Sequence, residues 1–141
     1  MNALRDDLRL IYDWIPAGSR VLDLGCGRGE LLSALVRDKQ CSGYGVEIDT
    51  EGVLASIAAG VNVIQADLEQ GLQDFDDNSF DVIVLSQTIQ AMQNTETILR
   101  DLTRVAREAV VSFPNFGYWR NRLQITLGGH MPVSERMPYQ W

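Results

Sequence analysis

A glycine-rich turn between a buried strand and a helix constrains this chain more than any other feature. Residues 21–24 form a short apolar run interrupted by Asp23, and glycines occupy every second position from 25 to 29. From position 30 onward, apolar residues recur at helical spacing. Glycine lets a backbone turn sharply and lets a ligand approach the main chain closely. The sequence therefore predicts a strand, a tight loop and a helix whose first N–H groups face a crevice.

Two further acids lie at the ends of the next two predicted strands. Residues 43–49 are predicted to form the second strand, with Glu47 near its carboxyl end, and Asp67 follows a third strand at 61–65. In a parallel sheet these ends meet at the edge that holds the glycine loop. A carboxylate there can accept both hydroxyl hydrogen bonds of a ribose. We therefore expect Asp23, Glu47 and Asp67 to converge on a nucleoside, although capping of a helix is an equally open role for Asp67.

The glycine spacing separates two kinds of nucleotide. A dinucleotide fingerprint has its third glycine five positions after the first, whereas here the third glycine comes four positions after the first and Glu occupies position 30. This spacing disfavours a nicotinamide-dependent oxidoreductase. The motif Asp-x-Gly-x-Gly-x-Gly, from Asp23 to Gly29, resembles that of class I S-adenosylmethionine-dependent methyltransferases. A glycine turn in an α/β protein that binds no cofactor is the alternative.

Helices and strands are predicted to alternate along the whole chain. Helices are expected at 3–15, 30–38, 50–60 and 95–107, and strands at 21–24, 43–49, 61–65, 80–86 and 109–113. In the third helix we expect Thr50 to be the cap and Val53, Leu54 and Ile57 to face inward. The strand at 80–86 is nearly continuous in apolar residues, which indicates burial on both faces. This order predicts an α/β fold, a doubly wound parallel sheet, in a single domain over 1–141.

Charge and cysteine content exclude several classes of function. The 141 residues carry a net charge of -7, so no basic patch is expected to bind nucleic acid or an anionic membrane. The chain has no long apolar run, and because it begins with a charged amphipathic stretch we expect no signal peptide. Cys26 and Cys41 are predicted at opposite ends of neighbouring strands, too far apart for a disulfide. Reduced cysteines favour a cytoplasmic protein.

Taken over residues 1 to 141, the sequence resembles the methionine biosynthesis protein MetW family. The segments that carry the resemblance are 13–16, 18–27, 62–65, 85–88, 90–92, 112–117, 127–129 and 131–133. The resemblance implies a Rossmann-like class I methyltransferase fold, which in this chain lacks the last two strands. We therefore expect the chain to be truncated at its C-terminus, with the fifth strand as an exposed edge.

The resemblance also implies S-adenosylmethionine or S-adenosylhomocysteine as the ligand. Asp67 would meet the adenine amine, Leu68 would pack on the ring, and Ser86 or Gln87 would meet the methionine part. The residues expected to bind the cofactor are Asp23, Gly25, Cys26, Gly27, Glu47, Ile48, Asp67, Leu68 and Ser86. No metal site and no catalytic residue are assigned, because no paired base is recognisable; the single histidine, His130, is expected to be a loop residue.

Two functions remain open at this stage. The resemblance implies a protein that acts beside homoserine O-acyltransferase in methionine synthesis, either as an S-adenosylmethionine-binding accessory subunit or as a methyltransferase for an unidentified small molecule. Aromatic residues and arginines gather in the last part of the chain: Phe113, Phe116, Tyr118, Trp119, Arg120, Arg122, Tyr139 and Trp141. They suit either a partner interface or packing on the sheet. A homodimer is left open as a further association.

Overall fold

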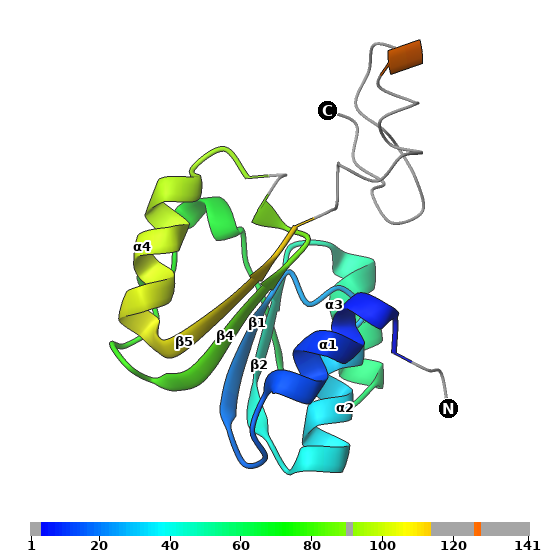
Figure 1. Cartoon of the computed structure of the whole chain (residues 1–141). Helices are drawn as coiled ribbons and strands as arrows, with labels where there is room; N and C mark the ends of the chain where they lie inside the picture. Colours follow the sequence, from blue (N-terminus) through cyan, green and yellow to red (C-terminus); the bar gives the residue numbers. More distant parts are fainter. Residues whose placement is uncertain (1–3, 90–91, 114–125, 128–141) are drawn as a thin grey trace.

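Five parallel strands form one sheet in a computed structural model that describes residues 4–89, 92–113 and 126–127 (Figure 1). The strand order is β3-β2-β1-β4-β5. The strands are β1 (Arg20–Leu24), β2 (Ser42–Glu47), β3 (Val63–Gln65), β4 (Phe80–Ser86) and β5 (Ala106–Ser112), and the helices are α1 (Asp6–Trp14), α2 (Glu30–Lys39), α3 (Thr50–Ala58), the 3-10 helix η1 (Leu68–Gln70) and α4 (Thr95–Val105). The predicted doubly wound α/β fold is confirmed.

The strand order creates a crevice beside β1. The chain builds β1, β2 and β3 outward in one direction, then crosses back so that β4 pairs with the other side of β1. Such a reversal leaves room beyond the carboxyl ends of the two central strands, and ligands of open α/β sheets bind there. The glycine loop follows β1, so the fold places that loop at the crevice.

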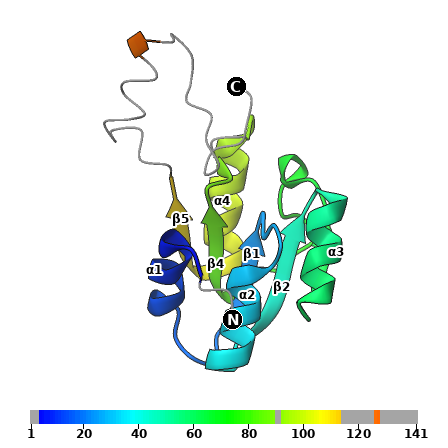
Figure 2. The same cartoon turned by 90° about the vertical axis from the view of Figure 1, so that its right-hand side faces the viewer.

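Helices lie on both faces of the sheet (Figure 2), and an apolar core is packed against each face. Helices α1 and α2 cover one face, and Leu8, Ile11 and Ile15 are buried there. Helix α4 covers the other face through Ile98 and Leu102. Strand β4 contributes side chains to both cores, which confirms its predicted burial on both faces.

The predicted inward face of the third helix is wrong at two of its three residues, and the third, Val53, is half-buried. Leu54 and Ile57 are 61% and 58% exposed, and the buried positions of α3 are the small residues Gly52 and Ser56. The helix packs these small residues against the glycine loop, so its larger side chains point outward. The predicted cap is also wrong by one residue: Asp49, not Thr50, caps α3, because its Oδ2 accepts a hydrogen bond from Gly52 N at 2.8 Å.

Other expectations change at the ends of elements. Strand β5 begins at Ala106, directly after α4, rather than at residue 109. In α4, Leu99 has the spacing of the buried face but is 44% exposed. Trp14, the last residue of α1, is 77% exposed. The aromatic and arginine positions after Phe113, together with His130, lie outside the described residues.

Neither cysteine forms a disulfide: Cys26 and Cys41 are both free thiols, as predicted.

Strand β5 is the outermost strand on its side of the sheet. Within the described ranges no other strand pairs with its outer edge. No helix in these ranges has the length and apolar character needed to cross a membrane.

Arg104 of α4 fixes the long connection that leads into β4. Its guanidinium donates hydrogen bonds to Leu72 O and Phe75 O at 2.8 Å, and to Asp77 Oδ1 at 2.9 Å. Asp101, one helical turn earlier, accepts from Leu72 N at 2.8 Å. The part of the connection between η1 and β4 is therefore held in place by hydrogen bonds from α4.

Replacing Arg104 with methionine is expected to lower the free energy of unfolding by about 2 kcal/mol, because two partly buried carbonyl groups lose a charged donor. Urea denaturation measures this difference. Arg100→Met is the matched control, since Arg100 is exposed on the same helix and pairs only with Glu96 among the described residues. It should cost less than about 0.5 kcal/mol. Equal losses of unfolding free energy in the two variants would contradict a stabilising role for the hydrogen bonds of Arg104.

Candidate functional site

The glycine loop adopts backbone conformations that other residues avoid. Gly25, Gly27 and Gly29 have φ angles of 72°, 55° and 72°, so all three occupy the left-handed region that favours glycine. The amides of Gly25 and Cys26 both donate to Val46 O, at 2.8 and 3.1 Å. The loop is therefore hydrogen-bonded to the end of β2, the strand next to the one it follows.

The three glycines differ in what surrounds them. A Cβ on Gly25 would lie 2.5 Å from Thr88 Oγ1, and a Cβ on Gly29 would lie 2.9 Å from Ser56 Oγ. A Cβ on Gly27 would meet no atom within 4 Å. Two of the glycines are thus required by close packing, whereas Gly27 borders open space at the crevice.

The carboxylate of Glu47 holds the loop at its middle. Oε2 accepts a hydrogen bond from Gly27 N at 2.8 Å, and Oε1 accepts from the amides of Ile48 and Asp49, both at 2.9 Å. Each carboxylate oxygen has two acceptor sites, so this arrangement orients Glu47 and leaves it able to accept from a ligand. The predicted meeting of Glu47 with the loop is confirmed.

Asp23 is a buried carboxyl group one residue before the end of β1. Its register partners are Gly45 in β2 and Val84 in β4, and the residue is 4% exposed. No hydrogen bond to its side chain is found within the described part of the chain. Burial, and secondarily the charge of Glu47, raise the pKa of Asp23 to about 7.

Asp67 caps η1. Its Oδ1 accepts a hydrogen bond from Glu69 N at 2.9 Å, so the capping role that the sequence left open is confirmed. Ala66 N donates to Glu47 O at 3.1 Å, which holds this turn beside the end of β2. Leu68 is partly buried against the core on the α4 face, while Ile48 is 61% exposed. A ligand role for these three residues stays a prediction.

Ser86 faces its neighbouring strand. Its hydroxyl lies 3.0 Å from Ser112 Oγ of β5. The residue of this segment that packs on the glycine loop is Thr88, whose side chain lies beside Gly25. Thr88 Oγ1 donates to Ser86 O at 3.0 Å. Gln87 has a φ of 52° and donates to Asp7 Oδ2 at 2.6 Å, so the start of α1 is attached to this loop.

Sequence reasoning missed Ser56 and Thr88. Ser56 is fully buried and donates to Gly27 O at 3.0 Å, and its Oγ lies 3.7 Å from Cys26 Sγ. A sequence signal for Ser56 was present: Gly52 and Ser56 are small residues four positions apart, and such a pair lets a helix approach a loop closely.

The thiol of Cys26 lies in the same loop. Burial, followed by the charge of Asp23, raises the pKa of Cys26 to about 11, so its thiol is neutral near pH 7 and is not a reactive nucleophile.

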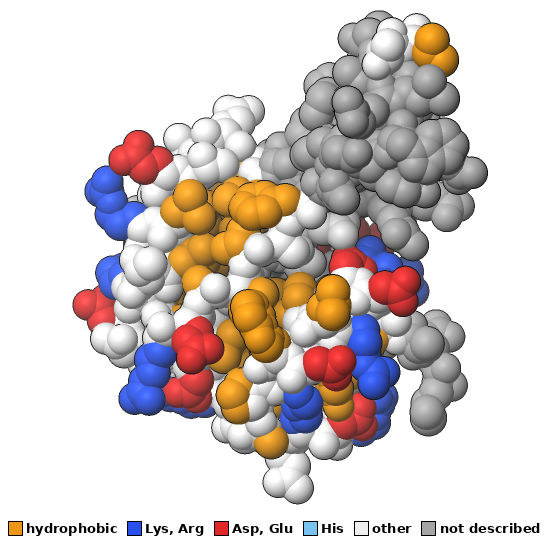
Figure 3. All heavy atoms as spheres, viewed as in Figure 1, with side chains coloured by type: hydrophobic (Ala, Val, Ile, Leu, Met, Phe, Trp, Pro, Cys, Tyr) orange, Lys and Arg blue, Asp and Glu red, His pale blue; other side chains and the backbone are white. Residues whose placement is uncertain are grey.

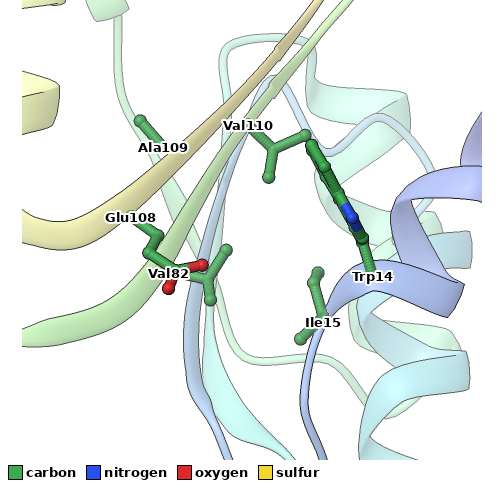
Figure 4. Close-up of a pocket in the computed structure, with 6 residues that line it drawn as sticks. All are labelled: Trp14, Ile15, Val82, Glu108, Ala109 and Val110. Carbon is green, nitrogen blue, oxygen red and sulfur yellow. The ribbon is translucent and has the colours of Figure 1, made fainter.

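A separate hollow of about 320 Å³ lies away from this loop, between the end of α1 and the edge strand (Figure 4). Its lining residues are Trp14, Ile15, Val82, Glu108, Ala109 and Val110. On the same side of the molecule, hydrophobic side chains gather between groups of charged ones (Figure 3). None of the expected ligand residues lines the hollow, so it is distinct from the glycine-loop site.

Comparisons with known proteins agree on one family. The family model described as methionine biosynthesis protein MetW matches residues 5–141. A curated relative, the bifunctional methionine biosynthesis protein MetXA/MetW of Rhodopirellula baltica, is 41% identical over 139 residues. That match covers 93% of this chain and 22% of the relative, so this chain spans about a fifth of the length of the relative.

Solved structures share the fold. A SAM-dependent methyltransferase from Archaeoglobus fulgidus superposes with a TM-score of 0.72 at 23% identity, over 91% of this chain and 60% of that one. A SAM-dependent methyltransferase from Thermotoga maritima gives 0.69 at 21% identity, over 85% and 56%. These likenesses establish a Rossmann-like methyltransferase fold for the chain.

Proposed function

The chain belongs to the methionine biosynthesis protein MetW family, and from this premise we propose that it binds S-adenosylmethionine or S-adenosylhomocysteine as an accessory, regulatory protein of methionine biosynthesis. Its partner in this proposal is a homoserine O-acyltransferase, in the cytoplasm. The site is the crevice formed by the glycine loop, Glu47 and Asp23, with Asp67, Leu68, Ile48 and Ser86 around its edge. The fraction of sites occupied would then depend on the concentration of S-adenosylmethionine, the downstream product of the pathway.

The observation that carries the ligand proposal is the position of Glu47. Its carboxylate is oriented by three backbone amides, one of them from Gly27, and Gly27 borders open space. A carboxylate held in this way keeps one acceptor site, on Oε2, for a hydroxyl of a ribose, and the absent side chain at position 27 lets a nucleoside approach the main chain. The fold relatives named as SAM-dependent methyltransferases support the same ligand.

The accessory role rests on two observations. The Rhodopirellula baltica relative joins MetXA and MetW in one polypeptide, and domains fused in one organism often associate as separate chains in another. The acids at the crevice are a poor set for general-base catalysis: Glu47 is engaged with three amides, and Asp23 is buried. A ligand can regulate a partner when it binds one of two states more tightly than the other.

A methyltransferase acting on an unidentified small molecule is the second candidate, because the fold is that of SAM-dependent methyltransferases. Methyl transfer from a sulfonium needs mainly the alignment of donor and acceptor, so a site without a dedicated base can still support it. A mixed assay separates the two candidates. A change in acyltransferase activity on adding this chain and S-adenosylmethionine, with no labelled methyl group transferred, supports the accessory role; transfer of label to a small molecule contradicts it.

Replacing Glu47 with glutamine is expected to weaken binding of S-adenosylhomocysteine by about 1.5–3 kcal/mol, which is roughly tenfold to hundredfold in the dissociation constant. The amide offers one acceptor oxygen in place of two, and its NH2 group would face a backbone N–H. Isothermal titration calorimetry measures the change.

The matched control is Glu51→Gln, which removes the same charge from an exposed position on α3. It should leave the dissociation constant within about twofold, since exposed charges are screened by salt. An absence of heat and of thermal shift with both S-adenosylmethionine and S-adenosylhomocysteine on the unmodified chain would contradict the proposed ligand. Equal weakening in both variants would contradict the role of Glu47.

A further inference from the structure

The carbonyl group of Gly27 is held by helix α3. Ser56 is fully buried on this helix, and its Oγ donates a hydrogen bond to Gly27 O at 3.0 Å. Gly52, one turn earlier, lies so close that a Cβ there would be 2.9 Å from the same oxygen. Among the described residues, the Ser56 hydroxyl is the one hydrogen-bond donor to this carbonyl group. The loop therefore lies against the two small residues of α3.

The direction of the hydrogen bonds around Ser56 follows from its single hydrogen. A hydroxyl group has one donor and two acceptor sites. Because Ser56 gives its hydrogen to Gly27 O, the contact of its Oγ with Cys26 Sγ at 3.7 Å requires the thiol to donate. The thiol keeps its proton near pH 7, since burial raises the pKa of Cys26 to about 11. Cys26 and Gly27 thus fix the orientation of the Ser56 hydroxyl from both sides.

Gly27 is hydrogen-bonded through both of its backbone groups. Its N–H donates to Glu47 Oε2 at 2.8 Å, and its C=O accepts from Ser56 Oγ. Each peptide unit is planar, so one bond orients the peptide before Gly27 and the other orients the peptide after it. Between these two units lie only the φ and ψ angles of Gly27. Glycine tolerates many values of these angles, so the side chains of Glu47 and Ser56 select one combination.

We propose that Ser56 is a positioning residue for the ligand of this crevice: its hydrogen bond keeps the peptide between Gly27 and Arg28 in the binding orientation before the ligand arrives. This rests on the proposed function, since it names a residue that prepares the same site. Ser56 has no exposed surface, so it acts through Gly27 and not by contact with the ligand.

Removal of the Ser56 hydroxyl leaves the peptide after Gly27 free to rotate. Only a fraction of the empty molecules then holds the binding orientation, and the apparent dissociation constant rises by the inverse of that fraction. The lost hydrogen bond is absent from the free and the bound protein alike, so its own contribution cancels. For Ser56→Ala we expect binding of S-adenosylhomocysteine to be about tenfold weaker, from a competent fraction of about one tenth.

The two rate constants of binding distinguish positioning from direct contact. In Ser56→Ala the association rate constant should fall about tenfold, because fewer molecules are ready to bind. The dissociation rate constant should stay within about twofold, because the bound ligand holds the loop in place, whereas loss of a direct contact acts mainly on dissociation. Surface plasmon resonance on the immobilised chain with S-adenosylhomocysteine measures both constants.

Ser33→Ala is the matched control. Ser33 on α2 also donates from its Oγ to a backbone carbonyl group, Ala59 O at 3.2 Å, which lies outside the glycine loop. Both rate constants of this variant should stay within about twofold of those of the unmodified chain. Equal effects in the two variants, or a change in Ser56→Ala confined to dissociation, would overturn the proposal. Circular dichroism checks that both variants are folded at the temperature used.

A second measurement needs no ligand. ¹⁵N relaxation reports backbone motion, through order parameters on the faster timescales and through dispersion on the microsecond to millisecond timescale. In the empty Ser56→Ala chain, the amides of Gly27, Arg28 and Gly29 should show lowered order parameters or dispersion, and in Ser33→Ala they should not. A loop as ordered in Ser56→Ala as in the unmodified chain would overturn the proposal.

The outcomes also separate this proposal from the proposed ligand. Binding of S-adenosylhomocysteine with unchanged rate constants in Ser56→Ala would overturn the positioning role and leave the ligand intact. A complete absence of binding to the unmodified chain would overturn both.

Discussion

Replacing Gly43 with alanine is expected to prevent stable folding, at a cost of more than about 4 kcal/mol in the free energy of unfolding. Gly43 pairs with Val21 in the centre of the sheet. Its φ is 152°, and a Cβ there would lie 1.8 Å from Val21 O. The clashing atom is backbone in a strand paired on both sides, so it cannot move aside without breaking the β1–β2 ladder. Thermal unfolding followed by circular dichroism measures the loss.

Gly60→Ala is the matched control for this prediction. Gly60 also has a positive φ, 77°, but a Cβ there would meet nothing within 4 Å. The substitution should cost about 1–2 kcal/mol, from the backbone conformation alone. A Gly43→Ala chain as stable as Gly60→Ala would show that β1 and β2 do not approach each other as closely as described.

Replacing Asp23 with asparagine is expected to stabilise the chain at pH 8.5, by an amount on the order of 3 kcal/mol. In the folded protein, burial raises the pKa of Asp23 from 3.8 to about 7. Ionising Asp23 at pH 8.5 therefore costs the folded state about 4 kcal/mol, at about 1.4 kcal/mol per pH unit. Burying the asparagine amide without a partner removes about 1 kcal/mol of that gain.

The sign follows from proton binding. Between about pH 4 and pH 7 the folded protein holds a proton on Asp23 that the unfolded chain has lost, so this group lowers the free energy of unfolding as the pH rises through that window. Above about pH 7 both states are ionised and the loss is complete. Asp23→Asn should abolish this decline, so the two chains should differ at pH 8.5 and converge near pH 5.

Urea denaturation at several values of pH measures the difference between the two chains. Asp81→Asn is a suitable control, because Arg20 lowers the pKa of Asp81, a half-buried acid at the start of β4. That variant should lose stability above about pH 4, the opposite direction, and by less than about 1 kcal/mol. A difference between Asp23→Asn and the unmodified chain that does not change with pH would contradict a buried acid with a raised pKa.

The order of strands and helices could be predicted from the sequence because local patterns encode it. Short runs rich in apolar residues indicated β1 and β4, and helical spacing indicated α1, α2 and α4. The spacing of the loop glycines indicated the class of nucleotide, and their positive φ angles confirm why glycine stands there. The acid at position 47 could be placed at the crevice because the carboxyl ends of parallel strands share one edge.

The predictions from sequence were wrong where tertiary packing decides which of two faces of a helix is buried. Leu54 and Ile57 have the spacing of a buried face, yet α3 turns Gly52 and Ser56 inward instead. A glycine loop leaves room only for small side chains on the helix that covers it, and that constraint comes from another part of the chain. Ser56 and Thr88 were missed for the same reason, since neither lies in the loop that it contacts.

The sequence by itself determined which residue types meet at the carboxyl edge of the sheet, because alternation of strands and helices fixes the edge at which each loop emerges. Only the tertiary structure decided what each acid does there. Glu47 is oriented by three amides, Asp67 caps a short helix, and Asp23 is buried without a partner within the described residues. Burial and hydrogen bonding depend on neighbours distant in the chain, and these neighbours set whether a carboxyl group holds a charge or a proton.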